Sequence, residues 1–481
     1  MNRKQRRAEA KRSGSAAQPA SPAVQQLFAA ALQLYQAGHL DEAEQRFRQV
    51  LAVNPRHADS LHLLGALAYQ TGRHDLAVEL IGKAIAINPK EASMHSNLGN
   101  MHTHLGRLDE AVACYRRALD LRPGFPEAHN NLGNALKARK ELDAAIVSYR
   151  SAIDLRPDDP EPHYNLGMAL LAHGDLAAGW QEHEWRWKTR QLRSGRRDFA
   201  QPQWRGEAAV GQTLLIHAEQ GYGDTIQFCR YAPLAAARGL RVVLEAPAPL
   251  VRLLQGLPGV DQVVAHGEPP PPFDLHCPML SLPPALGTTI ATIPSDVPYL
   301  HADEARVAAW RTRLAGLENQ GPRIGLVWNG NPRVALLSAA ALGRWRSVSP
   351  ERLAPLFEHP GPQFFSLQKD GPAPPAHFPV TGFMDEMEDF ADTAALIANL
   401  DLIISIDTSV AHLAAALGKP VWLLACFDPC WRWLVERRDS PWYPNLRLYH
   451  QPRPGDWDAV LAEVARDLRH FTLPEGSRRV P

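Results

Sequence analysis

The sequence predicts an all-α superhelix of repeats, followed by an α/β part with two doubly wound parallel sheets. Two observations support this fold class. Prolines recur every 34 residues in the first third of the chain, at Pro55, Pro89, Pro123 and Pro157. From about residue 211, short apolar runs alternate with helical segments, as strands and crossover helices do in parallel sheets. With 481 residues, the chain is also too long for a single core.

A second set of residues keeps the same 34-residue interval. Leu-Gly pairs stand at 64–65, 98–99, 132–133 and 166–167, and alanines recur at 43, 77, 111 and 145. An early Leu-Gly pair, a central alanine and a closing proline are typical of tetratricopeptide repeats, each a helical hairpin. Such hairpins stack into a superhelix whose concave face holds a partner. We therefore expect a protein or peptide partner on that face.

Small residues are expected wherever the helices of each hairpin meet or turn. The glycines of the Leu-Gly pairs should let neighbouring helices approach closely. Gly38, Gly72, Gly106 and Gly174 fall at the turn within a repeat, where positive φ favours glycine. The fourth repeat has Lys140 at this position, so its turn is expected to differ from the others.

The chain divides into seven predicted segments. They are a basic tail (1–21), four repeats (22–157), a partial capping repeat with a connector (158–204), the first α/β half (205–300), a linker (301–321), the second α/β half (322–450), and a final helix with a tail (451–481). Strands are expected at 213–217, 240–245, 261–265, 273–277, 323–328, 364–367, 402–407 and 421–424, and a helix at 225–238. The basic tail is either a disordered solubilising segment or a surface-binding arm.

Composition limits the classes of partner and the compartment. The formal net charge is zero, so no long-range field favours nucleic acid or an anionic membrane. The sequence contains no apolar run of the roughly 18 residues that a membrane span needs. Five scattered cysteines without a CxxC pair indicate reduced thiols. We expect a cytoplasmic protein with neither a transmembrane segment nor a nucleic-acid partner.

The first loop with chemical potential follows the strand at 213–217 and reads Glu-Gln-Gly-Tyr-Gly-Asp. Gln220, Gly221 and Gly223 form a tight turn that the backbone of a ligand could approach closely. The helix that follows offers free N–H groups to an anion. Asp224 is either a helix cap or a catalytic or sugar-binding carboxylate.

The second loop follows the apolar strand at 402–407. Asp407 ends the strand, and Thr408 and Ser409 open a helix whose N-terminal N–H groups can hold a diphosphate. His412 lies four residues after Thr408, on the same helix face. The alternative is an ordinary cap followed by a packing helix.

Further candidates stand at neighbouring strand ends. Asn329 follows the strand at 323–328, and Lys369 follows the next strand as a possible partner for a donor phosphate. The rings of the segment 431–444 could stack on a base or a sugar, or they could fill the core.

Together these segments resemble the glycosyltransferase module of bacterial tetratricopeptide glycosyltransferases, relatives of the family 9 heptosyltransferases. The resemblance covers residues 205–470. It is carried by Glu219–Asp224, Ser281–Pro283, Gly325–Pro332, Ser366–Lys369, Phe390–Leu417 and Trp431–Pro444. It implies a GT-B fold and inverting, metal-independent sugar transfer from a nucleotide-diphosphate sugar, with no cofactor. It also implies that Asp224 is the catalytic base and that Asp407, Thr408, Ser409 and His412 bind the donor, which is physically coherent.

Three features depart from the pattern of these relatives. Ser409 replaces their usual glycine, Cys430 replaces their acidic residue before Trp-Arg-Trp, and the stretch 333–341 is mostly apolar where theirs is polar. A second hypothesis is therefore a non-catalytic scaffold with a degenerate transferase module. A third is transfer to a glycan or a lipid-linked acceptor, with the repeats docking other enzymes.

Asparagines also recur in the repeats. Asn97, Asn131 and Asn165 precede the Leu-Gly pairs, with Asn100 and Asn134 in the same helices. This ladder resembles the one in O-linked N-acetylglucosamine transferases, and the resemblance implies binding of an extended acceptor peptide by its backbone. The alternative is that these amides cap or bridge neighbouring repeats.

Overall fold

The computed structural model describes residues 21–317, 321–330 and 346–471. The chain forms two compact units, Met1–Leu136 and Lys137–Pro481. The predicted apolar stretch 333–341, most of the basic tail and the last ten residues lie outside the described part.

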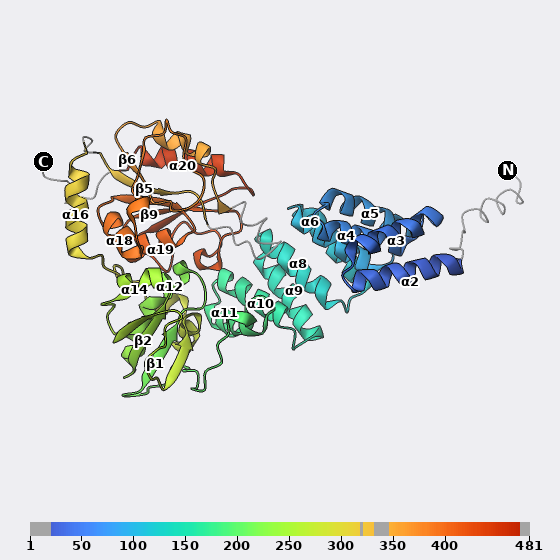
Figure 1. Cartoon of the computed structure of the whole chain (residues 1–481), viewed down its shortest axis with the longest axis horizontal. Helices are drawn as coiled ribbons and strands as arrows, with labels where there is room; N and C mark the ends of the chain where they lie inside the picture. The colour runs from blue at the N-terminus through green and yellow to red at the C-terminus, as the bar shows by residue number, and fades with distance from the viewer. Residues whose placement is uncertain (1–20, 318–320, 331–345, 472–481) are drawn as a thin grey trace, which may run out of the picture. The chain divides into compact units, whose positions relative to one another are not determined.

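Helical hairpins make up the first unit, as the 34-residue period predicts (Figure 1). Its helices are α2 (Pro22–Gln36), α3 (Leu40–Val53), α4 (Ala58–Gln70), α5 (His74–Ile87), α6 (Ala92–His104), α7 (Leu108–Leu121) and most of α8 (Pro126–Ala138). The second unit begins with α9 (Leu142–Leu155), α10 (Pro160–His173) and α11 (Leu176–His183), followed by the short helix η1 (Glu184–Lys188). The all-α prediction for this part of the chain is confirmed.

Two of the Leu-Gly glycines lie against a large side chain of the next helix. A Cβ atom on Gly65 would come within 2.6 Å of Ile81, and one on Gly99 within 2.6 Å of Tyr115. Both partners are buried. The glycine thus leaves room for the large side chain at the centre of the following helix. An alanine in place of the glycine would force the two helices apart.

The turn glycines adopt positive φ, as expected. Gly38, Gly72, Gly106 and Gly174 have φ between 73° and 97°. The expectation that the Lys140 turn would differ is wrong, because Lys140 itself adopts a φ of 65°. The hairpin geometry therefore dictates the backbone conformation even where no glycine is present.

Two parallel sheets follow, in agreement with the predicted α/β class. The first has the order β3-β2-β1-β4, with β1 (Thr213–His217), β2 (Arg241–Ala246), β3 (Gln262–Ala265) and β4 (Leu275–Pro278). The second has the order β10-β9-β8-β5-β6-β7. Its strands are β5 (Arg323–Val327), β6 (Gln363–Ser366), β7 (Val380–Gly382), β8 (Leu402–Ile406), β9 (Val421–Ala425) and β10 (Leu446–His450). All pairings in it are parallel. The edge strands β7 and β10 were not predicted.

Helices that follow the strands join the two sheets. On the first sheet these are α12 (Tyr222–Phe228), α13 (Ala232–Ala236) and α14 (Ala248–Leu254); on the second, α18 (Phe390–Ala398) and α19 (Ser409–Ala416). Helix α12 contacts α19, and α14 contacts α18, as the labels in Figure 1 allow the reader to follow. The single helix predicted at 225–238 is wrong: the segment starts at Tyr222 and is broken by a 3-10 turn at Cys229–Tyr231.

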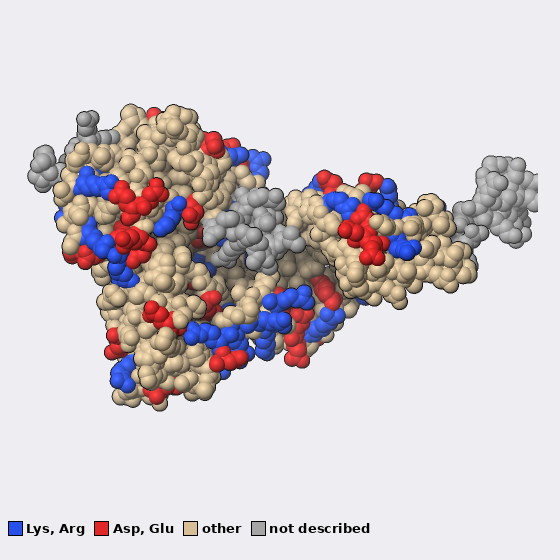
Figure 2. Space-filling model, in the orientation of Figure 1, with Lys and Arg blue, Asp and Glu red and all other residues tan. Residues whose placement is uncertain are grey.

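Among the described residues, we find no helix that combines the length and the hydrophobicity of a membrane span. Basic and acidic side chains are interspersed on the face that Figure 2 shows. This mixture agrees with the equal numbers of Lys plus Arg and Asp plus Glu in the sequence, 51 of each.

Candidate functional site

Two loops predicted from the sequence meet in the second unit, the one that contains Gly221 and Gly223 and the one that contains Thr408. One follows β1 and the other follows β8, so both stand at the carboxyl ends of parallel strands. A Cβ atom on Gly223 would lie 2.9 Å from Cδ2 of His412 and 3.6 Å from Cα of Ser409. Because Gly223 has no side chain, α12 and α19 touch at this point.

Asp224 lies in the first turn of α12 and has two partners. Its Oδ2 accepts a hydrogen bond from the N–H of Gly221 at 3.0 Å, and its Oδ1 accepts one from Nη2 of Arg432. Only 8 % of the residue is exposed. Asp224 therefore caps its helix and also forms a buried ion pair with the opposite half of the module.

Arg432 is the centre of this cluster, and it is not among the residues predicted from the sequence. Its Nε donates to Oε1 of Gln227 at 2.6 Å, and its Nη1 donates to Sγ of Cys430 at 3.0 Å. Burial opposes its charge, but Cys430 and Asp224 outweigh burial and raise the pKa of Arg432. The Trp-Arg-Trp triplet was the available signal, and only its rings were considered.

Asp407 interacts with a second arginine. Nη2 of Arg346 donates to the backbone carbonyl of Asp407 at 2.6 Å and lies 3.5 Å from its Oδ2. Burial alone would raise the pKa of Asp407, but the positive charge of Arg346 lowers it. Asp407 is therefore ionised at neutral pH, and Arg346 is a second site residue that sequence reasoning missed.

His412 is buried and neutral. Burial lowers its pKa to about 4, against an opposing effect of Asp407. Its Nδ1 lies 3.0 Å from the hydroxyl of Tyr443, and its Nε2 lies 3.8 Å from Oδ1 of Asp407. Its ring stacks on Trp433, with centroids 5.3 Å apart. A neutral imidazole held in this way can donate or accept a proton at Nε2.

Thr408 and Ser409 start α19. Thr408 is the N-cap residue, and its hydroxyl lies 3.1 Å from that of Ser405 rather than bonding to the helix backbone. Ser409 is the first residue of the helix. The N-terminus of α19 thus begins beside Asp407, next to the segment that meets α12.

Asn329 and Lys369 lie in neighbouring loops. Gln368 holds the first of these loops: its Oε1 accepts from the N–H of Asn329 at 2.8 Å, and its Nε2 donates to the Asn329 carbonyl at 2.9 Å. Lys369 is exposed and donates to the carbonyl of Met387 at 3.0 Å, in the segment before α18. These hydrogen bonds join Asn329 and Lys369 to Gln368 and Met387, not to the Asp224–Arg432 cluster.

The remaining residues of the loop after β1 lie next to a separate buried ion pair. Gln220 is half-buried and Gly221 is exposed. The preceding Glu219 accepts from Nε and Nη2 of Arg186 at 2.7 and 3.0 Å and from the N–H of Leu280 at 2.8 Å. Arg186 is fully buried, so it fixes the base of this loop to the connector after α11.

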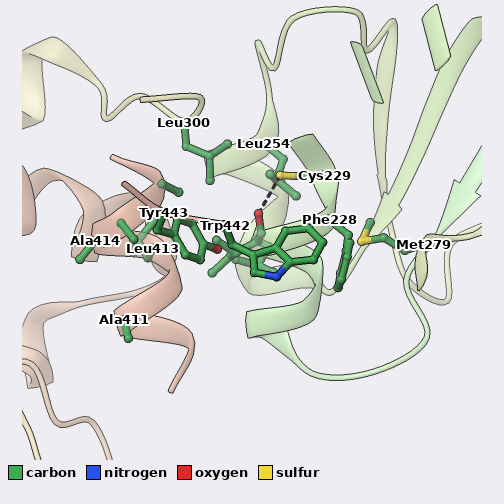
Figure 3. Close-up of a cluster of buried hydrophobic side chains, with 14 of the residues drawn as sticks. Phe228, Cys229, Leu254, Met279, Leu300, Ala411, Leu413, Ala414, Trp442 and Tyr443 are labelled. Atoms are coloured by element: carbon green, nitrogen blue, oxygen red, sulfur yellow. Dashed lines mark hydrogen bonds between the residues drawn. The ribbon is translucent and has the colours of Figure 1, made fainter. Parts of the chain in front are cut away.

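The aromatic segment 431–444 belongs to the core. Trp431, Trp433, Trp442 and Tyr443 are each at most 3 % exposed. Figure 3 shows Trp442 and Tyr443 between Phe228 at the end of α12 and the alanines of α19. Of the two alternatives for these rings, core packing is the one that the structure shows.

The asparagines of the repeats are half-buried and bond across helices. Nδ2 of Asn131 donates to Oδ1 of Asn100 at 2.9 Å, and Asn100 also accepts from the hydroxyl of Tyr115 at 2.8 Å. Asn97 lies 2.7 Å from Nε2 of His62. These amides bridge neighbouring helices, which was the alternative to peptide binding; Asn134 and Asn165 are also half-buried.

Comparisons with known proteins agree with both parts of the chain. Residues 28–92 match the tetratricopeptide repeat family, and residues 99–138 and 133–174 match a second family of these repeats. Residues 384–426 match glycosyltransferase family 9 (heptosyltransferase). This last segment contains α18, β8 and α19, and so the loop with Asp407 and His412.

One curated relative and several solved structures are similar to the chain. Protein FlbA of Caulobacter vibrioides is 28 % identical over 326 residues, which are 62 % of this chain and 53 % of that protein. The chain thus spans about half the length of this relative. MamA is 20 % identical with a TM-score of 0.31, covering 34 % of this chain and 97 % of that one. TTC0263 of Thermus thermophilus, a thermophilic tetratricopeptide protein, is 22 % identical with a TM-score of 0.31, covering 35 % and 92 %.

The chain thus combines segments similar to tetratricopeptide repeats with a C-terminal segment similar to glycosyltransferase family 9 (heptosyltransferase).

Proposed function

We propose that this protein is an inverting glycosyltransferase that uses a nucleotide-diphosphate sugar. The observation that carries the proposal is the convergence of Asp224 from the first sheet with Asp407 and His412 from the second. Ligands of open α/β sheets bind at the carboxyl ends of strands, where these three residues lie. The family 9 match over residues 384–426 supports the same reading.

The proposed reaction is a single displacement. The acceptor hydroxyl oxygen attacks C1 of the sugar, its proton passes to Asp224, and the C1–O bond to the phosphate breaks with its electron pair. The nucleoside diphosphate that leaves gains negative charge. Arg432, Arg346 and the N-terminus of α19 supply positive potential for it.

Asp224 needs a change of partner to act as a base. In the structure its carboxylate is held by Arg432, which occupies an oxygen that would have to accept the acceptor's proton. A donor diphosphate competes for the same guanidinium, because arginine binds phosphate and carboxylate with similar geometry. Donor binding would thus free Asp224 when the acceptor needs it.

The acceptor in this proposal is a cytoplasmic protein bound by the repeats. Asn97, Asn131 and Asn165 recur along the helices and are only half-buried, and side-chain amides both donate and accept hydrogen bonds, which suits an extended peptide backbone. Replacing all three by alanine should abolish transfer to protein acceptors and leave donor binding unchanged. The triple variant also loses the hydrogen bonds that these asparagines form between helices. Circular dichroism therefore checks that its repeats remain folded.

A second candidate is a non-catalytic scaffold, and one observation favours it. Asp224 is 8 % exposed, and both of its carboxylate oxygens have partners within the chain. A carboxylate in this state can serve as a structural link between the two sheets. The tetratricopeptide repeats would then recruit partners without chemistry.

Thermal unfolding of the full chain with UDP, GDP, ADP and CDP, with and without Mg²⁺, separates these two candidates. A nucleotide at 100 times its dissociation constant stabilises the folded protein by about 2.7 kcal/mol. We expect one nucleotide to raise Tm in the wild type and in the surface control Asp458→Asn, but not in Asp407→Ala. No shift with any nucleotide would favour the scaffold. Full transferase activity in Asp224→Asn would falsify the role of Asp224 as base.

A further inference from the structure

Two lysines at the turn between α8 and α9 contact the loop that follows β9. Nζ of Lys137 donates to both carboxylate oxygens of Asp428, at 3.0 and 3.3 Å. The ammonium of Lys140 lies over the ring of Phe427, 4.2 Å from its centroid. All four residues belong to the second unit, which begins at Lys137.

The ion pair of Lys137 with Asp428 is partly sheltered from water. The side chains of Lys137 and Asp428 are only 24 % and 22 % exposed. Burial alone would lower the pKa of Lys137, but the neighbouring Asp428 carboxylate raises it, so the ammonium is charged at neutral pH. A partly buried ion pair is screened less by salt than an exposed one.

Lys140 occupies its position despite an unfavourable backbone conformation. The equivalent turns have glycine at 38, 72, 106 and 174, and all adopt positive φ. Lys140 adopts the same conformation, with φ of 65°, where a Cβ atom is disfavoured. The contact with Phe427 gives a physical reason for a lysine here, since a glycine could not make it.

The loop that these lysines contact, which contains Phe427 and Asp428, continues along the chain into the candidate site. Its backbone is fixed near Asp428 by two bonds: Phe427 N–H donates to Oε1 of Gln451 at 3.1 Å, and Sγ of Cys426 donates to the Asp428 carbonyl at 3.2 Å. Four residues after Asp428 stands Arg432, which binds Cys430 and Asp224. One short segment therefore joins the α8–α9 turn to the ion pair between the two sheets.

We propose that Lys137 and Lys140 are positioning residues that hold the segment 426–432 and so set the geometry of Arg432 toward Asp224. The consequence for sugar transfer rests on the proposed function, whereas the positioning itself does not.

The two cysteines of the segment report on it directly. Cys426 and Cys430 are half-buried, while Cys229 and Cys277 are buried elsewhere in the same unit. The rate of alkylation by iodoacetamide, measured for each cysteine by mass spectrometry on the full chain, follows local opening of the segment. In Lys137→Ala we expect Cys426 and Cys430 to react about three to ten times faster, with Cys229 and Cys277 unchanged.

Matched variants make the test specific. Asp428→Asn should reproduce the effect from the other side of the pair, and Lys137→Ala with Asp428→Asn should add nothing further. Lys137→Arg should restore the wild-type rate. Lys83→Ala removes an exposed lysine that is paired with Glu79, and it should have no effect.

Two results would overturn the proposal: unchanged rates at Cys426 and Cys430 in both Lys137→Ala and Asp428→Asn, or equal acceleration at all four cysteines. The thiol readout needs no ligand. If Cys426 and Cys430 react faster in the variants but the protein binds no nucleoside diphosphate, the positioning role is supported. Only the proposed sugar transfer is then contradicted.

Discussion

Gly223 and His412 are in van der Waals contact, although 189 positions separate them in the chain. A Cβ atom on Gly223 would lie 2.9 Å from the imidazole, closer than such atoms approach in folded proteins. This contact is where the loop after β1 meets the helix after β8. The absence of one side chain thus allows the two halves of the candidate site to touch.

Replacing Gly223 with alanine should displace His412 and weaken the joint between the sheets. We expect Gly223→Ala to lower the free energy of unfolding by about 1–3 kcal/mol, the usual cost of overpacking. Gly221→Ala is the matched control, because its Cβ would meet only Asp224 at an ordinary 3.5 Å. Urea unfolding followed by tryptophan fluorescence measures the change, since all twelve tryptophans lie in the second unit, from Trp180 onward. Equal effects of the two variants would contradict the steric explanation.

The buried, neutral His412 should make stability depend on pH. Its pKa is about 4 in the folded protein and 6.5 when unperturbed, so the unfolded chain takes up its proton first as the pH falls. The stabilisation is complete above pH 6.5 and is lost as the pH falls toward 4, by up to about 3 kcal/mol.

Other buried histidines also titrate in this range, so the prediction is a difference between variants. The gap in unfolding free energy between wild type and His412→Gln should shrink by up to about 3 kcal/mol from pH 7 to pH 4. The exposed His39 gives the control His39→Gln, whose gap should not change in this way. A constant gap for His412→Gln would show that His412 is charged in the folded protein or does not titrate.

The ion pair of Asp224 with Arg432 should couple the two sheets energetically. Asp224→Asn removes the charge and keeps an oxygen for the Gly221 N–H, while Arg432→Met keeps the bulk of the side chain. Each single variant should cost about 3 kcal/mol, because it leaves one buried charge without its partner. The double variant should be less unstable than the sum, with a coupling energy of about 2 kcal/mol in urea unfolding. Additive effects would mean that the two residues do not interact in solution.

Lys140 tests the backbone strain of the fourth turn. Lys140→Gly and Lys140→Ala both remove the contact with Phe427, but only glycine accepts a φ of 65° without cost. The glycine variant should be more stable than the alanine variant by about 1 kcal/mol, measured by tryptophan fluorescence. If alanine were equal or better, the turn in solution would not have positive φ.

Local structure could be predicted from the sequence wherever the spacing of residues or a run of apolar residues indicates which side chains are buried. The 34-residue period placed the hairpins, and largely apolar runs such as 402–406 placed the buried central strands. The edge strand β7 was missed because its three residues are half-buried or exposed and carry no apolar run. The positive φ of Lys140 was missed because a lysine gives no local reason for it; the stacked hairpins impose it.

Within the candidate site, the same division holds. The loops with Asp224, Asp407 and His412 could be selected from the sequence, because glycines and small polar residues directly after apolar strands mark ligand-facing turns. The partners of these residues could not. Arg432 lies 208 positions from Asp224 and Arg346 lies 61 from Asp407, and such pairing depends on how two sheets close on each other.

The sequence by itself thus determined which residues stand at the ends of the parallel strands, since period and hydrophobicity are local properties. Only the tertiary structure decided that Asp224 is held by Arg432, that the tryptophans fill the core and that the repeat asparagines bond to neighbouring helices. The physical reason is that burial and charge pairing arise when distant segments exclude water together, and no short stretch of sequence carries that information.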